Sequence, residues 1–312
     1  MKAWTLPMLL LAFAARAQAQ QIAPMAVLPA GGAGPAGPVH LQWSLGQAVS
    51  RTFIGDGVLT AGVQQPDGAG PRLQVRVLLD GAWRAEAGLM VDSLRAQGVL
   101  PLEEPYTALG SLVTGPLHCD PAVLQVSGPD AITDWVLVEL RRAAAPAVVL
   151  EARAALLQRD GDIVAVDGVS PLRFNRLAEA FQVAVRHRNH LGALGAEVFQ
   201  PGTATVSLDL SLPATTTFGT NAQKSANGRQ FLWGGNVFRD GQLKYTGGNN
   251  DRDPILSAIG GIVPTNITTG YRVEDVNLDG AVKYTGGNND RDLVLSNVGG
   301  VVPTNIRNEQ LP

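Results

Sequence analysis

The chain has 312 residues, a formal net charge of −3 and a single cysteine, Cys119. A chain of this length can bury a hydrophobic core without disulfide bonds, and the lone cysteine is expected to be a small buried residue rather than a nucleophile. The charge excludes the basic surface that nucleic-acid binding requires, so no nucleic-acid partner is expected. The 36 glycines and 20 prolines are typical of a β-rich protein with many turns.

Residues 1–19 have the pattern of a secretory signal peptide. Lys2 provides a positive start, residues 4–15 form an apolar run, and Ala17-Gln18-Ala19 is typical of a cleavage site. The run is too short for a membrane span, although a membrane anchor is the alternative reading, and no later segment has the ~20 apolar residues of a span. The mature chain is therefore expected to be exported, with no transmembrane segment.

Residues 20–71 are predicted to be a flexible leader that ends in a β-hairpin. The leader is rich in Pro, Gly and Ala as far as residue 38. Residues 41–45 then alternate apolar and polar side chains, and Gly55-Asp56-Gly57 can turn the chain into a second strand at residues 58–63. The pattern Trp-Ser-Leu-Gly-Gln, followed by Leu-Thr-Ala-Gly-Val-Gln-Gln-Pro, resembles the leader segment of exported surface proteins of Gram-negative bacteria, which implies a cell-surface or secreted protein.

Residues 72–212 contain several short segments with the alternation of β-strands, separated by turn residues. The segments are residues 73–79, 131–140, 148–158, 163–166, 181–187 and 203–210. Asp160-Gly161 is a strong hairpin signal between two of them. The spacing predicts an antiparallel β-sandwich of immunoglobulin-like type, with a jelly roll as the alternative. A short helix is expected near residues 90–97.

The segment that most suggests chemistry is His187-Arg188-Asn189-His190, which could form a zinc site with His118 and Cys119. Side chains alternate along a strand, so His187 and His190 are expected to point to opposite faces, and the neighbouring arginines repel a dication. We therefore predict an ordinary strand end here.

The carboxylates of this region are scattered along separate strands, and none forms an acid/base pair of the kind that glycoside hydrolysis needs. No serine or cysteine lies in a nucleophile elbow. The chain is therefore not expected to be an enzyme, although a hydrolase with an unfamiliar arrangement stays open.

Residues 213–312 contain a duplicated segment. Residues 245–253 return as residues 284–292, and residues 263–267 return as residues 302–306, both with an offset of 39 residues. A fixed period in this range is typical of a duplicated supersecondary unit. Each copy is expected to carry a short helix, over residues 251–259 in the first and starting at Asn289 or Asp290 in the second.

The second copy opens like a hand-type calcium loop, with oxygen-bearing side chains at positions one, three and five and Gly280 at position six. Position seven would donate its backbone carbonyl, whereas Gly286 at position twelve has no side chain to ligate. The next carboxylate could reach the ion if the intervening insertion bulges outward, but Lys283 at position nine is unfavourable. The predicted Ca²⁺ ligands are Asp275, Asn277, Asp279, Ala281 and Asp290.

The first copy is a weaker candidate for calcium, because Phe238 stands at position three and offers no oxygen. Its predicted ligands are Asn236, Asp240 and Asp251. The alternative for both copies is that these Asp, Asn and Gly residues only form turns.

The loop-helix units, on the motif Asp275-x-Asn277-x-Asp279-Gly280-x-Val282, resemble the dockerin family. This resemblance implies paired calcium units that dock onto a cohesin-like partner or stabilise the end of a surface protein. Segments across residues 73–312 also resemble a module that stands beside C-terminal repeats in large bacterial surface proteins. The sequence thus indicates a non-catalytic exported protein with calcium-binding repeats; the alternative is a carbohydrate-binding accessory of polysaccharide processing with a docking module.

Overall fold

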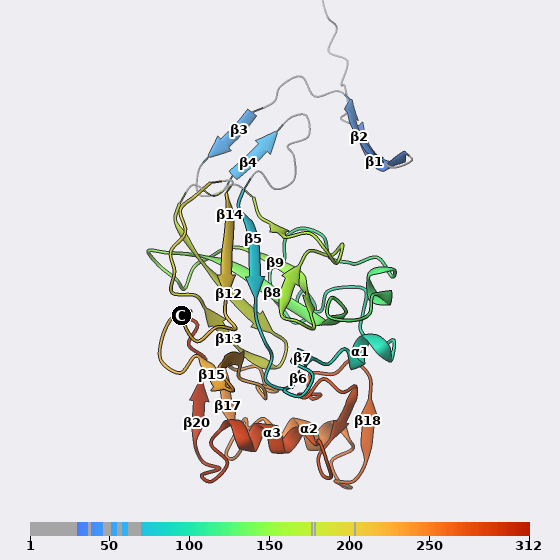
Figure 1. Ribbon diagram of the computed structural model, residues 1–312, viewed down its shortest axis with the longest axis vertical. Helices are drawn as coiled ribbons and strands as arrows, with labels where there is room; N and C mark the ends of the chain where they lie inside the picture. The colour runs from blue at the N-terminus through green and yellow to red at the C-terminus, as the bar shows by residue number, and fades with distance from the viewer. Residues whose placement is uncertain are drawn as a thin grey trace, which may run out of the picture. The chain divides into compact units, whose positions relative to one another are not determined.

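The chain forms two units, Met1–Gln65 and Pro66–Pro312 (Figure 1). The computed structural model describes residues 30–36, 39–45, 51–54, 58–61, 70–175, 177, 179–202 and 204–312. The predicted signal peptide lies outside the described residues. No helix in the described part is long and apolar enough to cross a membrane.

The described residues of the first unit form two antiparallel strand pairs. Strand β1 (Ala30–Ala36) pairs with β2 (Val39–Leu45), and β3 (Arg51–Ile54) pairs with β4 (Val58–Ala61). The predicted hairpin is therefore wrong in its pairing: residues 58–61 pair with residues 51–54 and not with residues 41–45. Part of the predicted flexible leader forms β1. Its sequence is rich in Gly and Ala and has no alternation of apolar and polar residues, so it did not predict a strand.

The second unit is built on one sheet of eight strands. In space the order is β11-β5-β10-β9-β8-β12-β13, with β14 on the other edge of β5. All neighbours are antiparallel except β14, which is parallel to β5. The strands are β5 (Arg72–Arg76), β8 (Ile132–Arg142), β9 (Val149–Gln158), β10 (Asp162–Val164), β11 (Leu172–Arg173), β12 (Phe181–His187), β13 (His190–Leu194) and β14 (Thr205–Asp209).

This architecture confirms a mainly β, antiparallel fold. The immunoglobulin-like sandwich is not confirmed, because the described strands of residues 72–209 share one hydrogen-bonded sheet. The sheet curls so that its distant edges meet: a Cβ on Gly195, just after β13, would lie 2.9 Å from Cδ2 of Leu208 in β14. Phe218 then donates its amide to the carbonyl of Leu194, so the chain after β14 continues along the β13 edge.

Strand β8 is the centre of the sheet, with β9 on one edge and β12 on the other. Its side chains are buried on both faces, and Trp135 is fully buried. Trp135 Nε1 donates to the carbonyl of Pro101, so the polar end of this large side chain has a partner. Cys119 is buried in the same core, as predicted.

Short elements cover the rim of the sheet. They are β6 (Trp83–Arg84), β7 (Leu89–Met90), α1 (Ser93–Ala96), the 3₁₀ turn η1 (Val123–Gln125), β15 (Gln223–Ala226) and β16 (Arg229–Leu232). A bridge between Leu79 and Leu232 ties the segment that precedes the repeats to the residues that follow β5.

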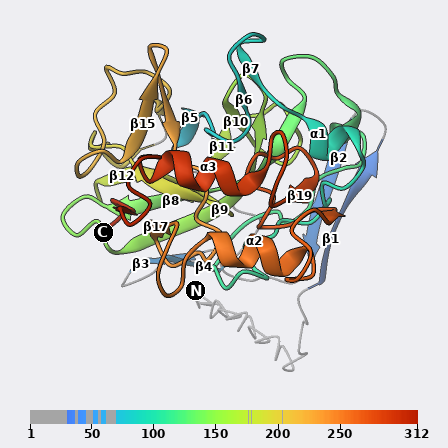
Figure 2. The ribbon, with the colours of Figure 1, turned by 90° about the horizontal axis from the view of Figure 1, so that it is seen from below.

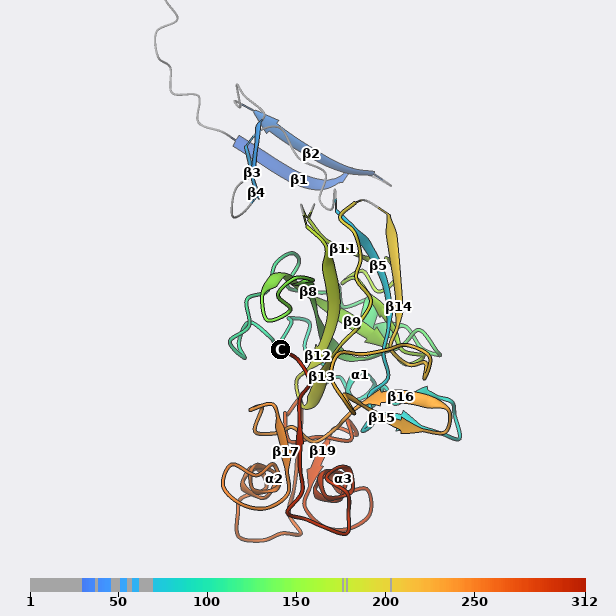
Figure 3. The same ribbon diagram turned by 90° about the vertical axis from the view of Figure 1, so that its left-hand side faces the viewer.

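The two repeats form a pair below the sheet, with helices α2 and α3 side by side (Figures 2 and 3). Each copy donates its last strand to the other copy: β17 pairs with β20, and β18 pairs with β19. Thr246 Oγ1 likewise donates to the carbonyl of Pro303, and Thr285 Oγ1 to that of Pro264. The elements are β17 (Gln242–Lys244), α2 (Arg252–Ala258), β18 (Ile267–Thr269), β19 (Ala281–Lys283), α3 (Asp290–Asn297) and β20 (Ile306–Asn308).

Both predicted repeat helices are confirmed. Asn289 is the N-cap of α3, because its side chain accepts the amide of Asp292 at 2.9 Å. Ile255 of α2 and Val294 of α3 are fully buried in a small core that the two copies share. This small core is separate from the main core of the sheet, although β13 contributes Leu191 to it.

We expect Ile255→Ala to lower the free energy of unfolding by about 2–5 kcal/mol, because it leaves a cavity in this small core. Ile262 is the matched control, since it is 88% exposed in the same copy. Ile262→Ala should change stability by less than about 0.5 kcal/mol. Chemical denaturation of both variants measures the difference, and equal losses would contradict the assigned core.

Candidate functional site

The two repeat loops have the same backbone shape. Leu278 and Gly280 of the second copy have φ angles of 57° and 87°, and the aligned Arg239 and Gly241 of the first have 60° and 74°. A left-handed conformation at a leucine and an arginine is uncommon, so the loop must impose it. The duplication therefore extends upstream of the near-identical segments, to residues whose side chains differ.

In the second copy, Asp275 closes its own loop. Its Oδ1 accepts the amide of Asp279 at 3.1 Å, and its Oδ2 accepts the amide of Gly280 at 2.9 Å. Asn277 Oδ1 also accepts the Asp279 amide, at 2.9 Å. Positions one, three and five of the predicted loop thus lie together.

Asp290 reaches the same loop across the predicted insertion. Its Oδ1 accepts the amides of Val276 at 2.7 Å and Asn277 at 3.2 Å, and its Oδ2 accepts the amide of Lys283 at 2.8 Å. Asn277 Nδ2 donates to the carbonyl of Asn288, which holds the insertion against the loop. The structure therefore brings Asp290 to the position-one end of the loop.

The carboxylates of Asp275 and Asp290 are fully buried. Burial raises the pKa of each to about 7, and in Asp290 the nearby charge of Asp275 contributes to the rise. Among the described residues, no lysine or arginine forms an ion pair with either carboxylate. The loop therefore holds two close acidic groups whose only direct partners are backbone amides.

Asp279 differs from these two carboxylates, because it has a cationic partner. Lys283 Nζ lies 2.6 Å from its Oδ2, while its Oδ1 accepts the amide of Ala281. Lys283 thus places its charge on the position-five carboxylate, beside the predicted site, as the sequence suggested.

The first copy repeats part of this arrangement. Asp251 accepts the amides of Phe238 at 2.9 Å and Lys244 at 2.7 Å, and burial raises its pKa to about 7. Asp240 pairs with Lys244 at 3.3 Å. Asn236 departs from the pattern: its buried Oδ1 has no hydrogen-bond partner among the described residues, so it does not close its loop as Asp275 does.

The described residues contain no group of three or more His, Cys, Asp or Glu side chains arranged as a metal site. The second loop instead combines two buried carboxylates with an amide oxygen and a backbone carbonyl. Such hard oxygen donors suit Ca²⁺. Both oxygens of Asp275 and Oδ2 of Asp290 accept one amide each and keep a lone pair for a cation, whereas Oδ1 of Asp290 already accepts two amides. The donor set therefore fits calcium, with Asp275, Asn277, Asp290 and the Ala281 carbonyl as the residues that would hold it.

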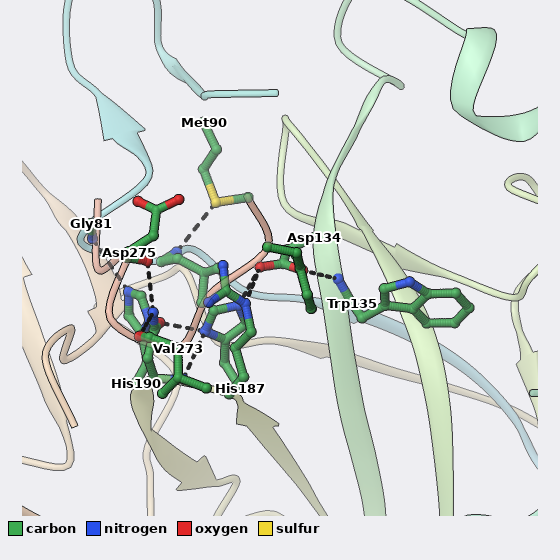
Figure 4. A network of polar contacts seen from close by, with 12 residues as sticks. Gly81, Met90, Asp134, Trp135, His187, His190, Val273 and Asp275 are labelled. Atoms are coloured by element: carbon green, nitrogen blue, oxygen red, sulfur yellow. Dashed lines mark hydrogen bonds and ion pairs between the residues drawn. The ribbon is translucent and has the colours of Figure 1, made fainter. Parts of the chain in front are cut away.

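A buried polar network joins the sheet to the second repeat loop (Figure 4). Its anchor is Asp134 of β8, whose Oδ2 accepts from Arg188 Nε at 2.9 Å and lies 3.1 Å from His187 Nε2. Tyr271, at the start of the second copy, donates its hydroxyl to Oδ1 at 2.8 Å. Burial alone would raise the pKa of Asp134, but the charge of Arg188 and these hydrogen bonds lower it to about 2.

The expectation that His187 and His190 point to opposite faces is wrong. His187 ends β12 and His190 begins β13, so the two face each other across a tight hairpin, and their Nδ1 atoms are 3.0 Å apart. None of their described contacts involves His118 or Cys119. Sequence alternation failed here because the strand ends between the two histidines.

The same hairpin binds the second repeat loop directly. Asn189 Nδ2 donates to the carbonyls of Val273 at 2.7 Å and Asp275 at 2.8 Å. Arg188 Nη1 donates to the carbonyl of Arg272, and the guanidinium lies over the ring of Tyr271. Sequence reasoning missed this network, because its members are far apart in the chain and each carboxylate looked isolated.

Comparisons with known proteins identify no relative: no protein-family model, no curated protein and no solved structure matches the chain.

The network predicts a pH dependence of stability. Gly81 donates its amide to His190 Nε2 at 3.3 Å, which leaves the His190 proton on Nδ1, facing His187. Burial lowers the pKa of His190 well below its usual value, and the charges of His187, Arg188 and Lys224 lower it further. Protonation of His190 would turn Nε2 into a donor that faces the donor of Gly81.

Below the unfolded-state pKa of about 6.5, His190 therefore binds a proton in the unfolded chain but not in the folded chain. The free energy of unfolding consequently decreases as the pH is lowered. We expect His190→Gln to reduce this slope between pH 6.5 and 5, by up to about 1.4 kcal/mol per pH unit. Urea denaturation at several pH values measures it. The buried aspartates of the repeats change the free energy of unfolding in the opposite direction as the pH falls, but they are present in both the wild type and the variant. Identical slopes for the two proteins would therefore contradict the assignment of the pH dependence to His190.

Proposed function

We propose that this is an exported, non-catalytic surface protein in which Ca²⁺ orders the C-terminal repeats. The observation that carries the proposal is the pair of buried carboxylates of Asp275 and Asp290, neither of which forms an ion pair with a lysine or arginine among the described residues, although the charge of Arg188 lowers the pKa of Asp275 in part. Burying an unpaired carboxylate is costly, and a bound dication removes that cost. The dockerin-like reading of the loops rests on the same residues.

Calcium at this loop would also act on the contact between the repeats and the sheet. The carbonyls of Val273 and Asp275, which receive Asn189, lie at the entry to the loop. Gln97 Nε2 donates to the carbonyl of Asp279 at 2.7 Å, and Leu278 is buried in the core of the sheet. Ordering the loop would therefore fix the orientation of the repeats on the sheet.

A role in protein docking is supported by apolar side chains exposed at matching positions of the two copies. Ile262 and Val301 are 88% and 90% exposed, and Ile267 and Ile306 are 60% and 54% exposed. Exposed apolar groups that occur twice suit a partner that contacts both copies, such as a cohesin-like or other surface protein. The alternative role, a carbohydrate-binding accessory, has less support, because only 5% of the residues are aromatic.

We expect Ca²⁺ at ten times its dissociation constant to stabilise the full chain by about 1.4 kcal/mol. Extracellular calcium loops bind at about 10⁻⁴–10⁻³ M, so the titration should extend to 10 mM. Calorimetry and thermal unfolding should both show saturable binding. Asp275→Asn and Asp290→Asn should each abolish the calcium-dependent rise in unfolding temperature, whatever they do to stability in EDTA.

Asp292→Asn is the matched control for these variants. Asp292 lies two residues after Asp290 on the same helix, but its side chain is 54% exposed and pairs with Arg291. The calcium response should survive this change. A wild-type chain with no response at 10 mM Ca²⁺ would end the calcium proposal, and a response that persists in Asp275→Asn and Asp290→Asn would move the site elsewhere.

Export makes a separate prediction about the N-terminus of the mature chain. If residues 1–19 are a signal peptide, the protein recovered from outside the cytoplasm of a Gram-negative expression host should begin at Gln20. N-terminal sequencing of that fraction measures this directly. A chain that stays in the cytoplasm with Lys2 still present would contradict export.

A further inference from the structure

Three polar side chains meet where the rim of the sheet contacts the helix of the second repeat copy. Lys224 lies on β15, Asn297 ends α3, and Asp80 follows β5. Lys224 Nζ donates to Asn297 Oδ1 at 2.9 Å and lies 2.8 Å from Asp80 Oδ1. Asn297 Nδ2 in turn donates to Asp80 Oδ2 at 2.7 Å. Each of the three side chains therefore contacts the other two.

The side-chain amide of Asn297 is held in one orientation. The residue is fully buried, and its Nδ2 donates a second hydrogen bond to the carbonyl of Gly234 at 2.8 Å. Both hydrogens of Nδ2 and the oxygen Oδ1 thus have partners. The carbon Cγ, which is bonded to Oδ1, is therefore fixed beside the amine of Lys224.

The lysine and the aspartate are mostly shielded from water. Their side chains are 24% and 11% exposed, and Nζ of Lys224 lies 5.9 Å from the centre of the Trp233 ring. Proton transfer within such a pair replaces two poorly solvated charges by two neutral groups. A lysine amine becomes a nucleophile when it loses its proton. Asp80 is the group in contact with Nζ that can accept this proton.

The helix itself does not require an asparagine at this position. The first copy has Ala258 at the equivalent place, 39 residues earlier, although Leu-Ser precedes both positions. The side-chain partners of Asn297 are Lys224, Asp80 and Gly234, and all three lie outside the duplicated segments. The asparagine therefore serves the contact with the rim of the sheet and not the repeat fold.

We propose that Lys224 and Asn297 form an intramolecular isopeptide bond, with Asp80 as the proton carrier. Asp80 takes a proton from the Lys224 ammonium, and the neutral Nζ attacks Cγ of Asn297. A bond forms between Nζ and Cγ, and the bond between Cγ and Nδ2 breaks as Asp80 protonates Nδ2. Asp80 then takes up the second proton of the attacking nitrogen and passes it to the departing ammonia. The products are a secondary amide and one ammonium ion.

The reaction needs no oxidant, cofactor or second substrate. The reacting groups are held in contact, so the step is effectively unimolecular. The bond joins the rim of the sheet to α3 and closes a loop of 73 positions. The chain has a single cysteine and no internal disulfide to do this. Such a cross-link stabilises mainly by restricting the unfolded chain, and this inference does not depend on calcium binding.

The test is a tryptic peptide map of the purified full chain by tandem mass spectrometry. The wild type should yield one linked species that contains the peptides of Lys224 and Asn297 and is lighter than their sum by one ammonia. Cyclisation of an N-terminal glutamine also releases ammonia, so the linked species is decisive and the intact mass is not. Only unlinked peptides from the folded wild type would overturn the proposal, and the three side chains would then be an ordinary ion pair with an amide partner.

Lys224→Arg and Asp80→Asn should each abolish the linked species, because the first removes the nucleophile and the second the proton carrier. Lys244→Arg is the matched control, since Lys244 pairs with Asp240, and it should keep the linked species. Loss of the bond should lower the unfolding temperature by roughly 10 °C in circular-dichroism melts, which also show that each variant is folded. A linked species that persists in Lys224→Arg or in Asp80→Asn would overturn the assigned roles.

Discussion

The second unit depends on one buried charge, the carboxylate of Asp134 near the start of β8. It has no contact with solvent, and it is held ionised by Arg188, His187 and Tyr271. Removing a partner from a buried ion pair typically costs about 3–5 kcal/mol, because the remaining charge stays unsolvated. An exposed pair such as Arg252–Asp253 contributes about 0–1 kcal/mol. The constraint on the fold therefore comes from the buried pair, and the surface pairs are secondary.

That constraint extends from the sheet to the repeats. To reach Asp134, both His187 and Arg188 must stand in the tight hairpin between β12 and β13. The hairpin then presents Asn189 to the backbone of the second copy, while Tyr271 of that copy returns to Asp134. Sheet and repeats thus satisfy one another's buried polar groups, which explains why residues 66–312 form one unit although their two hydrophobic cores are separate.

What could be predicted from the sequence was mostly local. The strands around Asp160-Gly161 and the cap at Asn289 were predictable, because a turn or a cap is decided by a few neighbouring residues. The single curled sheet was not, because it depends on β14 pairing in parallel with the distant β5. The hairpin pairing in the first unit failed for a similar reason, since Gly- and Ala-rich β1 shows no alternation.

The candidate site divides in the same way. The spacing of Asp275, Asn277 and Asp279 predicted a common loop, and Asp290 does reach it. The Asp134 network could not be predicted, because it joins Asp134 to residues that lie 53, 54 and 137 positions away in the chain. The sequence showed a difference between the copies at Phe238, whereas the structure shows a second difference at Asn236, whose Oδ1 has no hydrogen-bond partner among the described residues.

The exchange of terminal strands between the copies has a consequence for how this region can change over generations. In a single copy, the strand that follows the loop (β17 or β19) would lack its partner from the other copy (β20 or β18). The last strand of that copy would likewise have no partner. Unpaired strand edges promote association with other chains. Recombination that deletes or adds a single copy would therefore leave strands without a partner, whereas loss or gain of both copies would not. The pair of copies is thus the smallest unit that can be lost or gained without exposing a strand edge.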